Sequence, residues 1–132
     1  KKAVSIPVIA NGDIFTPGDA EHILRYTGAE LCMVGRGSFG YPWIFPQANA
    51  LLEGREIPEL PPLSERIGLA LRQTEMYAGR FGERLACLEA RHQIPWYLKG
   101  VSHAGYYKQP LVRVETLEEL RGIVNGIKRD LV

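Results

Sequence analysis

The sequence is poor in cysteine, in net charge and in long apolar runs. Its 132 residues include two cysteines, Cys32 and Cys87, which belong to no Cys-x-x-Cys or mixed Cys/His pattern. We therefore expect neither a disulfide framework nor a metal site, and reduced thiols favour a cytoplasmic protein. No apolar stretch approaches the ~20 residues that a membrane-spanning helix needs, so no membrane partner is expected.

The net charge of +1 is unevenly distributed along the chain. Residues 64–113 contain eight Lys/Arg and four Asp/Glu, whereas residues 1–63 contain five and seven. A basic segment with aromatic residues among its charges is typical of a polyanion-binding surface. On charge alone, however, an ordinary solvated surface is the simpler interpretation.

Two short apolar runs, Ile6–Ala10 and Leu31–Val34, predict β-strands that end at glycine-containing loops. Between them, Thr16 and Asp19 form a capping-box pattern at the start of a helix that ends at Gly28. The pattern predicts one β-α-β unit with parallel strands. Because parallel strands are buried on both faces, we expect further strands beside them. Either the chain is part of a longer protein, which we favour, or the strands find partners by association.

A proline-rich stretch without periodicity predicts a linker over residues 54–63, between a first domain at 1–53 and a helical domain at 64–132. In the second domain apolar residues recur at helical spacing. Pro95 predicts a kink or break, and residues 103–109 a loop or short helix. A further capping box at Thr116 and Glu119 predicts the last helix.

The two glycine-bounded loops at the strand ends indicate a phosphate site. In TIM barrels, loops that follow the last two strands often bind phosphate. Gly12 and Gly35 allow a close backbone approach, and Arg36 offers a charge-assisted contact. A helix that starts after Gly37 would add its positive end. Glycines that merely terminate strands are the alternative, but two such loops favour phosphate binding.

Several segments resemble the C-terminal part of tRNA-dihydrouridine synthases. They are Ile6–Ile14 with its Asn-Gly-Asp-Ile loop, Met33–Gly37 with Gly-Arg-Gly, and Gly40–Phe45, which reads Gly-Tyr-Pro-Trp-Ile-Phe. Arg91–Gly100 is similar to a basic-aromatic segment of the family's helical domain, in which Pro95 is unusual. The resemblance implies an α/β barrel fragment, the last β-α-β of a TIM barrel, followed by an all-α helical bundle.

The resemblance also implies the chemistry of a longer parent enzyme, which would use FMN and NADPH to reduce uridine in tRNA to 5,6-dihydrouridine. Asn11, Gly12, Asp13, Gly35 and Arg36 match the family's FMN phosphate loops. The family's catalytic cysteine belongs to an earlier barrel loop that has no counterpart here. We therefore expect no catalytic residue in the chain, an inactive fragment and a monomeric parent.

Three basic residues of the helical part are candidates for binding RNA. Arg84 and Arg91 are seven residues apart, so one helix face can present both to phosphates. Lys99 precedes Gly100, which leaves room for a nucleic-acid backbone. Trp96 is of a type that stacks on bases, but in an amphipathic helix we expect it in the core.

Two alternatives remain open from the sequence. One is another FMN- or phosphate-binding TIM-barrel oxidoreductase that acts on a small molecule, such as a dihydroorotate dehydrogenase-like protein. The other is a helical RNA-binding module without catalysis. The first alternative is favoured if the parent protein acts on a small molecule and binds no RNA. The second is favoured if the native protein begins near Lys1.

Overall fold

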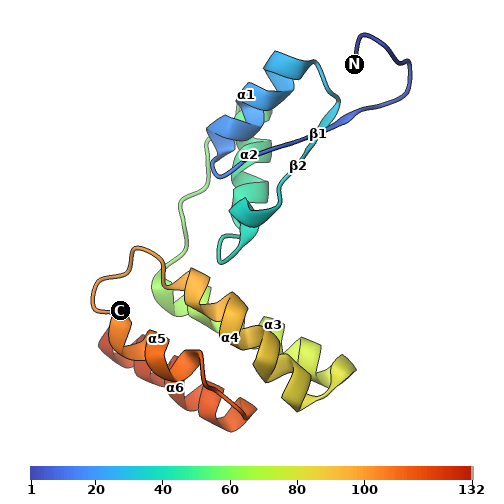
Figure 1. The fold of residues 1–132 in the computed structure, drawn as a ribbon. Helices are drawn as coiled ribbons and strands as arrows, with labels where there is room; N and C mark the ends of the chain where they lie inside the picture. Colours follow the sequence, from blue (N-terminus) through green and yellow to red (C-terminus); the bar gives the residue numbers. More distant parts are fainter. Residues whose placement is uncertain (132) are drawn as a thin grey trace. The chain divides into compact units, whose positions relative to one another are not determined.

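The computed structural model describes residues 1–131 and divides the chain into two compact units. The first unit comprises Lys1–Leu60 and the second begins at Pro61 (Figure 1). Each unit has a core of its own. Among the described residues, none of the helices is both long and apolar enough to cross a membrane.

The first unit contains two short parallel strands and two α-helices. Strand β1 pairs with β2 in parallel, with Ile9 opposite Leu31, which confirms the predicted β-α-β arrangement. The strands are shorter than the apolar runs that predicted them. The elements are β1 (Ile9–Asn11), α1 (Pro17–Thr27), β2 (Leu31–Met33), the 3-10 helix η1 (Arg36–Ser38) and α2 (Ile44–Leu52).

Helix α1 begins and ends as its sequence predicts. The backbone N–H of Asp19 donates to Thr16 Oγ1 at 3.1 Å, and Asp19 Oδ2 accepts from the Thr16 N–H at 2.8 Å. Asp19 also accepts from the Phe15 N–H, and this bond is the main reason why the pKa of its carboxyl is lowered. Gly28 closes the helix in the left-handed conformation at φ 67°.

Only one face of the two-stranded sheet is covered. Figure 1 shows α1 and α2 on the same side of the strands, where Cys32 packs against the core of the unit. On the other face, Ile9, Leu31 and Met33 are 54%, 58% and 53% exposed. The open face is compatible with the expectation that these strands need further strands beside them, because the described residues contain no other strand to pair with β1 or β2. The buried core residues are Ile14, Ala20, Ile44 and Ala48.

The second unit consists of helices packed around a closed apolar core. A single residue, Gly82 at φ 91°, separates α3 from α4, so the two helices pack as a hairpin. Helix α6 packs on α3, and α5 contacts both α4 and α6. The elements are α3 (Leu63–Phe81), α4 (Glu83–Tyr97), α5 (Gly105–Leu111) and α6 (Leu117–Asp130). The largest fully buried side chains are Ile67, Cys87, Ile94, Leu98, Leu111, Leu120, Val124 and Ile127.

Three local predictions need correction. Pro95 does not break α4, which continues to Tyr97. The proline lacks the N–H that would donate to the carbonyl four residues earlier, but only two helical residues follow it. Trp96 is not a core residue but is 45% exposed. The α-helix expected after Gly37 does form, but it begins at Ile44, and the three-residue η1 (Arg36–Ser38) precedes it.

Candidate functional site

The two glycine-containing loops enclose one cavity at the carboxyl ends of β1 and β2. Parallel strands place their carboxyl ends at the same edge of a sheet, so loops from distant parts of the sequence meet there. All five predicted cofactor residues line this cavity of about 350 Å³. Its lining residues are Asn11, Gly12, Asp13, Ile14, Phe15, Met33, Gly35, Arg36 and Gly37.

The backbone of both loops requires small residues at specific points. Gly12 has φ 144°, and Asp13 adopts φ 41°, a left-handed conformation that Asp tolerates better than most side chains. A Cβ on Gly37 would lie 1.9 Å from the carbonyl oxygen of Ile14, so this glycine lets the loops touch. At Gly35 and Gly12 an added Cβ would meet nothing within 4 Å, which leaves open space for a ligand.

One ion pair connects the two loops across the cavity. Arg36 Nη2 lies 3.3 Å from Asp13 Oδ1, and their side chains are 75% and 80% exposed. Ser38 Oγ donates to the Gly35 carbonyl oxygen at 2.8 Å and shapes the turn that carries Arg36. Arg36 is the one basic residue among the lining residues, so its guanidinium is the positively charged group of the cavity that can attract an anion.

The donor set of this cavity fits a phosphate group. Open glycine backbone, the exposed Arg36 guanidinium and the first N–H groups of η1, which have no acceptor within that helix, all suit a phosphate oxygen. No residue of α2 is among those that line the cavity. Arg36 and the loop backbone are therefore the groups on which anion binding depends.

The predicted RNA-binding residues differ in their surroundings. Arg84 is exposed on α4. Arg91 is only 27% exposed in its side chain: its Nε donates to the Val114 carbonyl oxygen at 2.9 Å, and its Nη2 lies 4.0 Å from Glu115. Arg91 thus ties α4 to the segment before α6, which is a structural role.

An exposed basic-aromatic pair lies at the end of α4. The Lys99 ammonium lies 5.9 Å from the centre of the Trp96 ring, within the range of a cation–π contact. Sequence analysis selected Lys99 but assigned Trp96 to the core. The i, i+3 spacing of the two residues near the helix end was the signal for their proximity.

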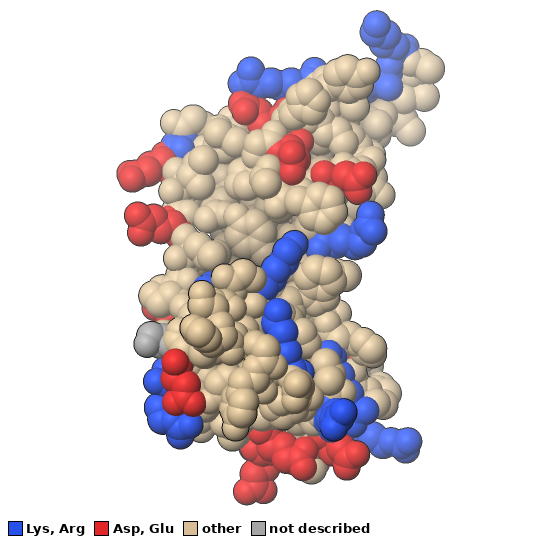
Figure 2. Space-filling view, turned by 60° about the vertical axis from the view of Figure 1, so that its left-hand side comes forward, with Lys and Arg blue, Asp and Glu red and all other residues tan. Residues whose placement is uncertain are grey.

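The surface charge of the helical unit is mixed. On the face drawn in Figure 2, basic side chains are spread over this unit, while most of the acidic side chains lie along its lower edge. Recognition of a polyanion on this face would thus depend on individual residues and not on a uniform basic surface.

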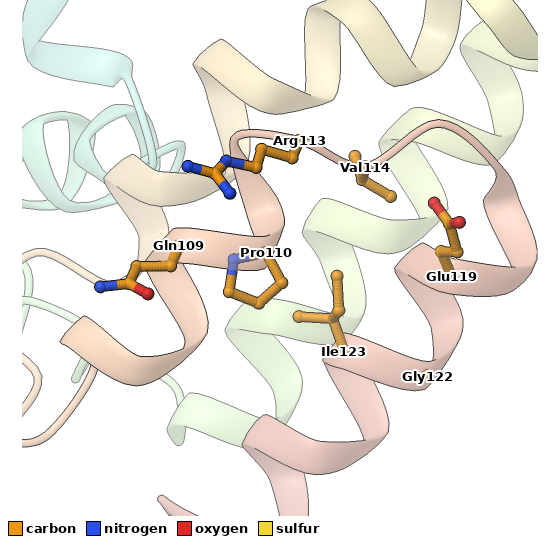
Figure 3. Close-up of a pocket in the computed structure, with 7 residues that line it drawn as sticks. All are labelled: Gln109, Pro110, Arg113, Val114, Glu119, Gly122 and Ile123. Carbon is orange, nitrogen blue, oxygen red and sulfur yellow. The ribbon is translucent and has the colours of Figure 1, made fainter.

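A second cavity, of about 640 Å³, lies between α5 and α6 (Figure 3). Pro110 and Ile123 face each other at its centre, and Gly122 leaves the α6 side open. Arg113 and Glu119 lie at the periphery, and the Glu119 carboxylate is already used by the N–H groups of residues 115 and 116. Sequence analysis did not predict this groove, which contains none of the candidate RNA-binding residues.

Neither cysteine lines the cavity at the strand ends. Cys32 is half-buried in β2 and Cys87 is buried in α4. Burial raises the pKa of both thiols. Among residues 1–131 there is also no group of three His, Cys, Asp or Glu side chains placed to hold a metal ion.

Comparison with known proteins identifies the family. The family model described as dihydrouridine synthase (Dus) matches residues 1–130. This chain belongs to the dihydrouridine synthase family. It is 39% identical over 127 residues to tRNA-dihydrouridine synthase B of Vibrio cholerae, a match that covers 96% of this chain and 39% of that protein. A probable tRNA-dihydrouridine synthase of Mycobacterium leprae is 35% identical over 123 residues, with 93% and 32% covered.

The match spans about two fifths of the length of several dihydrouridine synthase relatives, including that of Pasteurella multocida, which is 35% identical with 98% of this chain and 40% of that protein covered. The resemblance on which the sequence analysis relied is thus confirmed at the level of the family.

Proposed function

We propose that this chain supplies the FMN phosphate site and the tRNA-binding helices of a flavin-dependent enzyme that reduces uridine in tRNA to 5,6-dihydrouridine. The observation that carries the proposal is the meeting of the Asn11–Asp13 and Gly35–Arg36 loops around one cavity, in a chain of the dihydrouridine synthase family. The relatives are named as synthases that act on tRNA, and we extend that substrate to the parent of this chain.

The uncovered face of the sheet supports a larger barrel in the parent protein. Ile9, Leu31 and Met33 expose apolar side chains on a parallel pair, and parallel sheets are stable when both faces are covered. We propose that further strands of a TIM barrel pair with β1 and β2 and cover these residues. Residues 1–53 then form the last β-α-β part of that barrel, residues 54–63 the linker and residues 64–132 the helical domain.

The residues of the first unit would bind the cofactor and not the reacting atoms. FMN, when bound, supplies hydride transfer from NADPH to the uracil ring. In this chain Arg36 and the loop backbone would hold the phosphate end of the cofactor. The acid that completes the reduction would be a cysteine outside this chain, because Cys32 belongs to strand β2 and Cys87 is buried in helix α4 of the helical unit.

The helical unit would bind tRNA through phosphate contacts and shape. Arg84 and Lys99 are exposed, and the Lys99–Trp96 pair offers a charge beside an aromatic ring, a combination suited to RNA. Arg91 would act indirectly, by holding the segment before α6 in place. A target uridine must leave its stack to reach the flavin, so the helices would orient the tRNA and not read the base.

The first experiment is an assay of the complete protein. It is incubated with unmodified tRNA and NADPH, and dihydrouridine is measured by nucleoside mass spectrometry. We expect wild type to form dihydrouridine and Arg36→Ala to lose FMN and activity. Arg55→Ala, which removes an exposed arginine paired with Glu53 outside the cavity, should leave both unchanged.

The same assay decides between the proposal and its alternatives. A yellow, FMN-containing protein that forms no dihydrouridine would favour an oxidoreductase that acts on a small molecule. A protein that binds tRNA but no flavin would favour an RNA-binding module. The 132-residue chain alone should show no turnover, and measurable turnover would contradict the placement of the catalytic cysteine outside it.

A further inference from the structure

We propose that Asp13 is a positioning residue that holds the Arg36 guanidinium over the phosphate cavity and does not itself bind the phosphate. The inference rests on the proposed FMN site. The two residues of opposite charge in this anion site would have different roles: Arg36 contacts the phosphate, and Asp13 orients Arg36.

The geometry gives the Asp13 carboxylate one basic partner. Both side chains belong to the lining of the cavity, and Arg36 Nη2 approaches Asp13 Oδ1 at 3.3 Å from the other loop. A carboxylate beside a phosphate dianion would repel it, since like charges at close range disfavour each other. Direct binding of phosphate by Asp13 is therefore unfavourable, whereas orientation of the guanidinium is favourable.

The backbone conformation of Asp13 suggests that its side chain is needed there. Asp13 adopts φ 41°, a conformation that glycine reaches without strain and that most other residues avoid. The neighbouring residue is already Gly12, at φ 144°. The residues that follow the pair are also in close contact, because the backbone of Gly37, directly after Arg36, packs against that of Ile14, directly after Asp13.

An unrestrained arginine side chain must lose rotamer freedom when it binds an anion, at a cost that lowers affinity. Held by Asp13, the Arg36 side chain has lost part of that freedom beforehand. The carboxylate also keeps one edge of the guanidinium engaged and leaves the other N–H groups to the phosphate, because five donors are available.

Two substitutions separate the carboxylate from the backbone. Asp13→Gly keeps the left-handed conformation without a side chain, and Asp13→Asn keeps an acceptor oxygen and tolerance of positive φ without the charge. Each is combined with Arg36→Ala to close a double-mutant cycle in the complete protein. Dissociation constants for FMN and for riboflavin, which lacks the phosphate, are measured by flavin fluorescence.

Wild type should bind FMN more tightly than riboflavin, and Arg36→Ala should weaken FMN binding roughly 10- to 100-fold. Asp13→Gly should weaken FMN binding about three- to fivefold, the range of an exposed ion pair, and Asp13→Asn by less. Riboflavin binding should change less than twofold. In the Arg36→Ala background, both Asp13 substitutions should have no further effect.

Tighter FMN binding by Asp13→Gly would show that the carboxylate only repels the phosphate, and would overturn the inference. Equal losses for FMN and riboflavin, or a loss that persists without Arg36, would also overturn it, because Asp13 would then merely support the fold. If wild type does not distinguish FMN from riboflavin, the proposed phosphate site itself is wrong, which is a separate result.

Discussion

The two units of this chain bury their apolar residues in different ways. In the second unit, residues such as Ile67, Ile94 and Leu120 are fully enclosed by helices of the same unit. In the first, α1 and α2 cover one side of β1 and β2, and the other side exposes Leu31 and Met33. A closed core allows a unit to fold from its own sequence, whereas an open sheet depends on structure supplied from elsewhere.

We expect the largest difference in folding stability when the two units are expressed separately. Residues 61–132, expressed alone, should unfold in one cooperative transition with a stability of roughly 3–10 kcal/mol, as expected for a domain of this size. Residues 1–60 alone should show no cooperative transition, because a two-stranded sheet with one open face is marginal. Circular dichroism during heating and urea titration measures both. A cooperative transition of residues 1–60 would remove the contrast.

A substitution that creates a cavity in the closed core should have the next largest effect on stability. Leu120 on α6 is fully buried, so Leu120→Ala should destabilise the helical unit by about 2–5 kcal/mol. Leu85→Ala on α4 is the matched control, because Leu85 is exposed, and should cost well under half as much. Urea midpoints of the two variants provide the comparison, and equal losses would mean that the core is not closed at Leu120.

The sequence predicts those features of the fold that depend on neighbouring residues. The capping boxes at Thr16 and Thr116, the helix end at Gly28 and the parallel β-α-β order all follow from local patterns. So do the loops of the phosphate cavity, because strand order places consecutive strand ends together. The five cofactor candidates could therefore be named from sequence, although their role remains a prediction.

Features that depend on distant contacts were not predictable. The bond from Arg91 to the Val114 carbonyl oxygen joins residues 23 apart, so the arginine predicted to bind RNA also holds α4 to the segment before α6. The exposure of Trp96 depends on which face of α4 meets α3, and helical periodicity alone does not determine this near a helix end. The groove between α5 and α6 is likewise a product of tertiary packing.

Two glycines on α6 should respond to alanine with opposite signs. A Cβ at Gly126 would lie 2.8 Å from Tyr107 Cε1, so Gly126→Ala should displace the ring and cost about 1–3 kcal/mol. At Gly122 an added Cβ meets nothing within 4 Å, and Gly122→Ala should stabilise the helix by about 0.5–1 kcal/mol. Thermal midpoints of the helical unit measure both. Stabilisation by both substitutions would show that α5 does not pack closely on α6.

The smallest effect we expect is a pH dependence of folding stability, which can be measured only in the helical unit with its closed core. In α6, Arg129 Nε lies 2.6 Å from Asp130 Oδ1, and Tyr107 donates a hydrogen bond to the same carboxylate. These partners, Arg129 foremost, lower the pKa of Asp130 from 3.8 to about 2. In the first unit, bonds from Lys1 and the Val8 N–H similarly lower the pKa of Glu30 to about 2.

A carboxyl whose pKa is lowered in the folded state stabilises that state above its unfolded pKa, and the stabilisation is lost as pH falls through the folded pKa. The Asp130 contribution should thus be complete above pH 4 and disappear towards pH 2. Asp130→Asn should reduce the loss of stability of the helical unit between pH 4 and 2. Glu118→Gln, which removes the same charge from the same helix, should reduce this loss less.

Glu30→Gln should not change the unfolding curves of residues 1–60, because that unit has no cooperative transition to shift. Equal slopes for Asp130→Asn and Glu118→Gln between pH 4 and 2 would mean that the Tyr107–Asp130–Arg129 contact does not persist in solution.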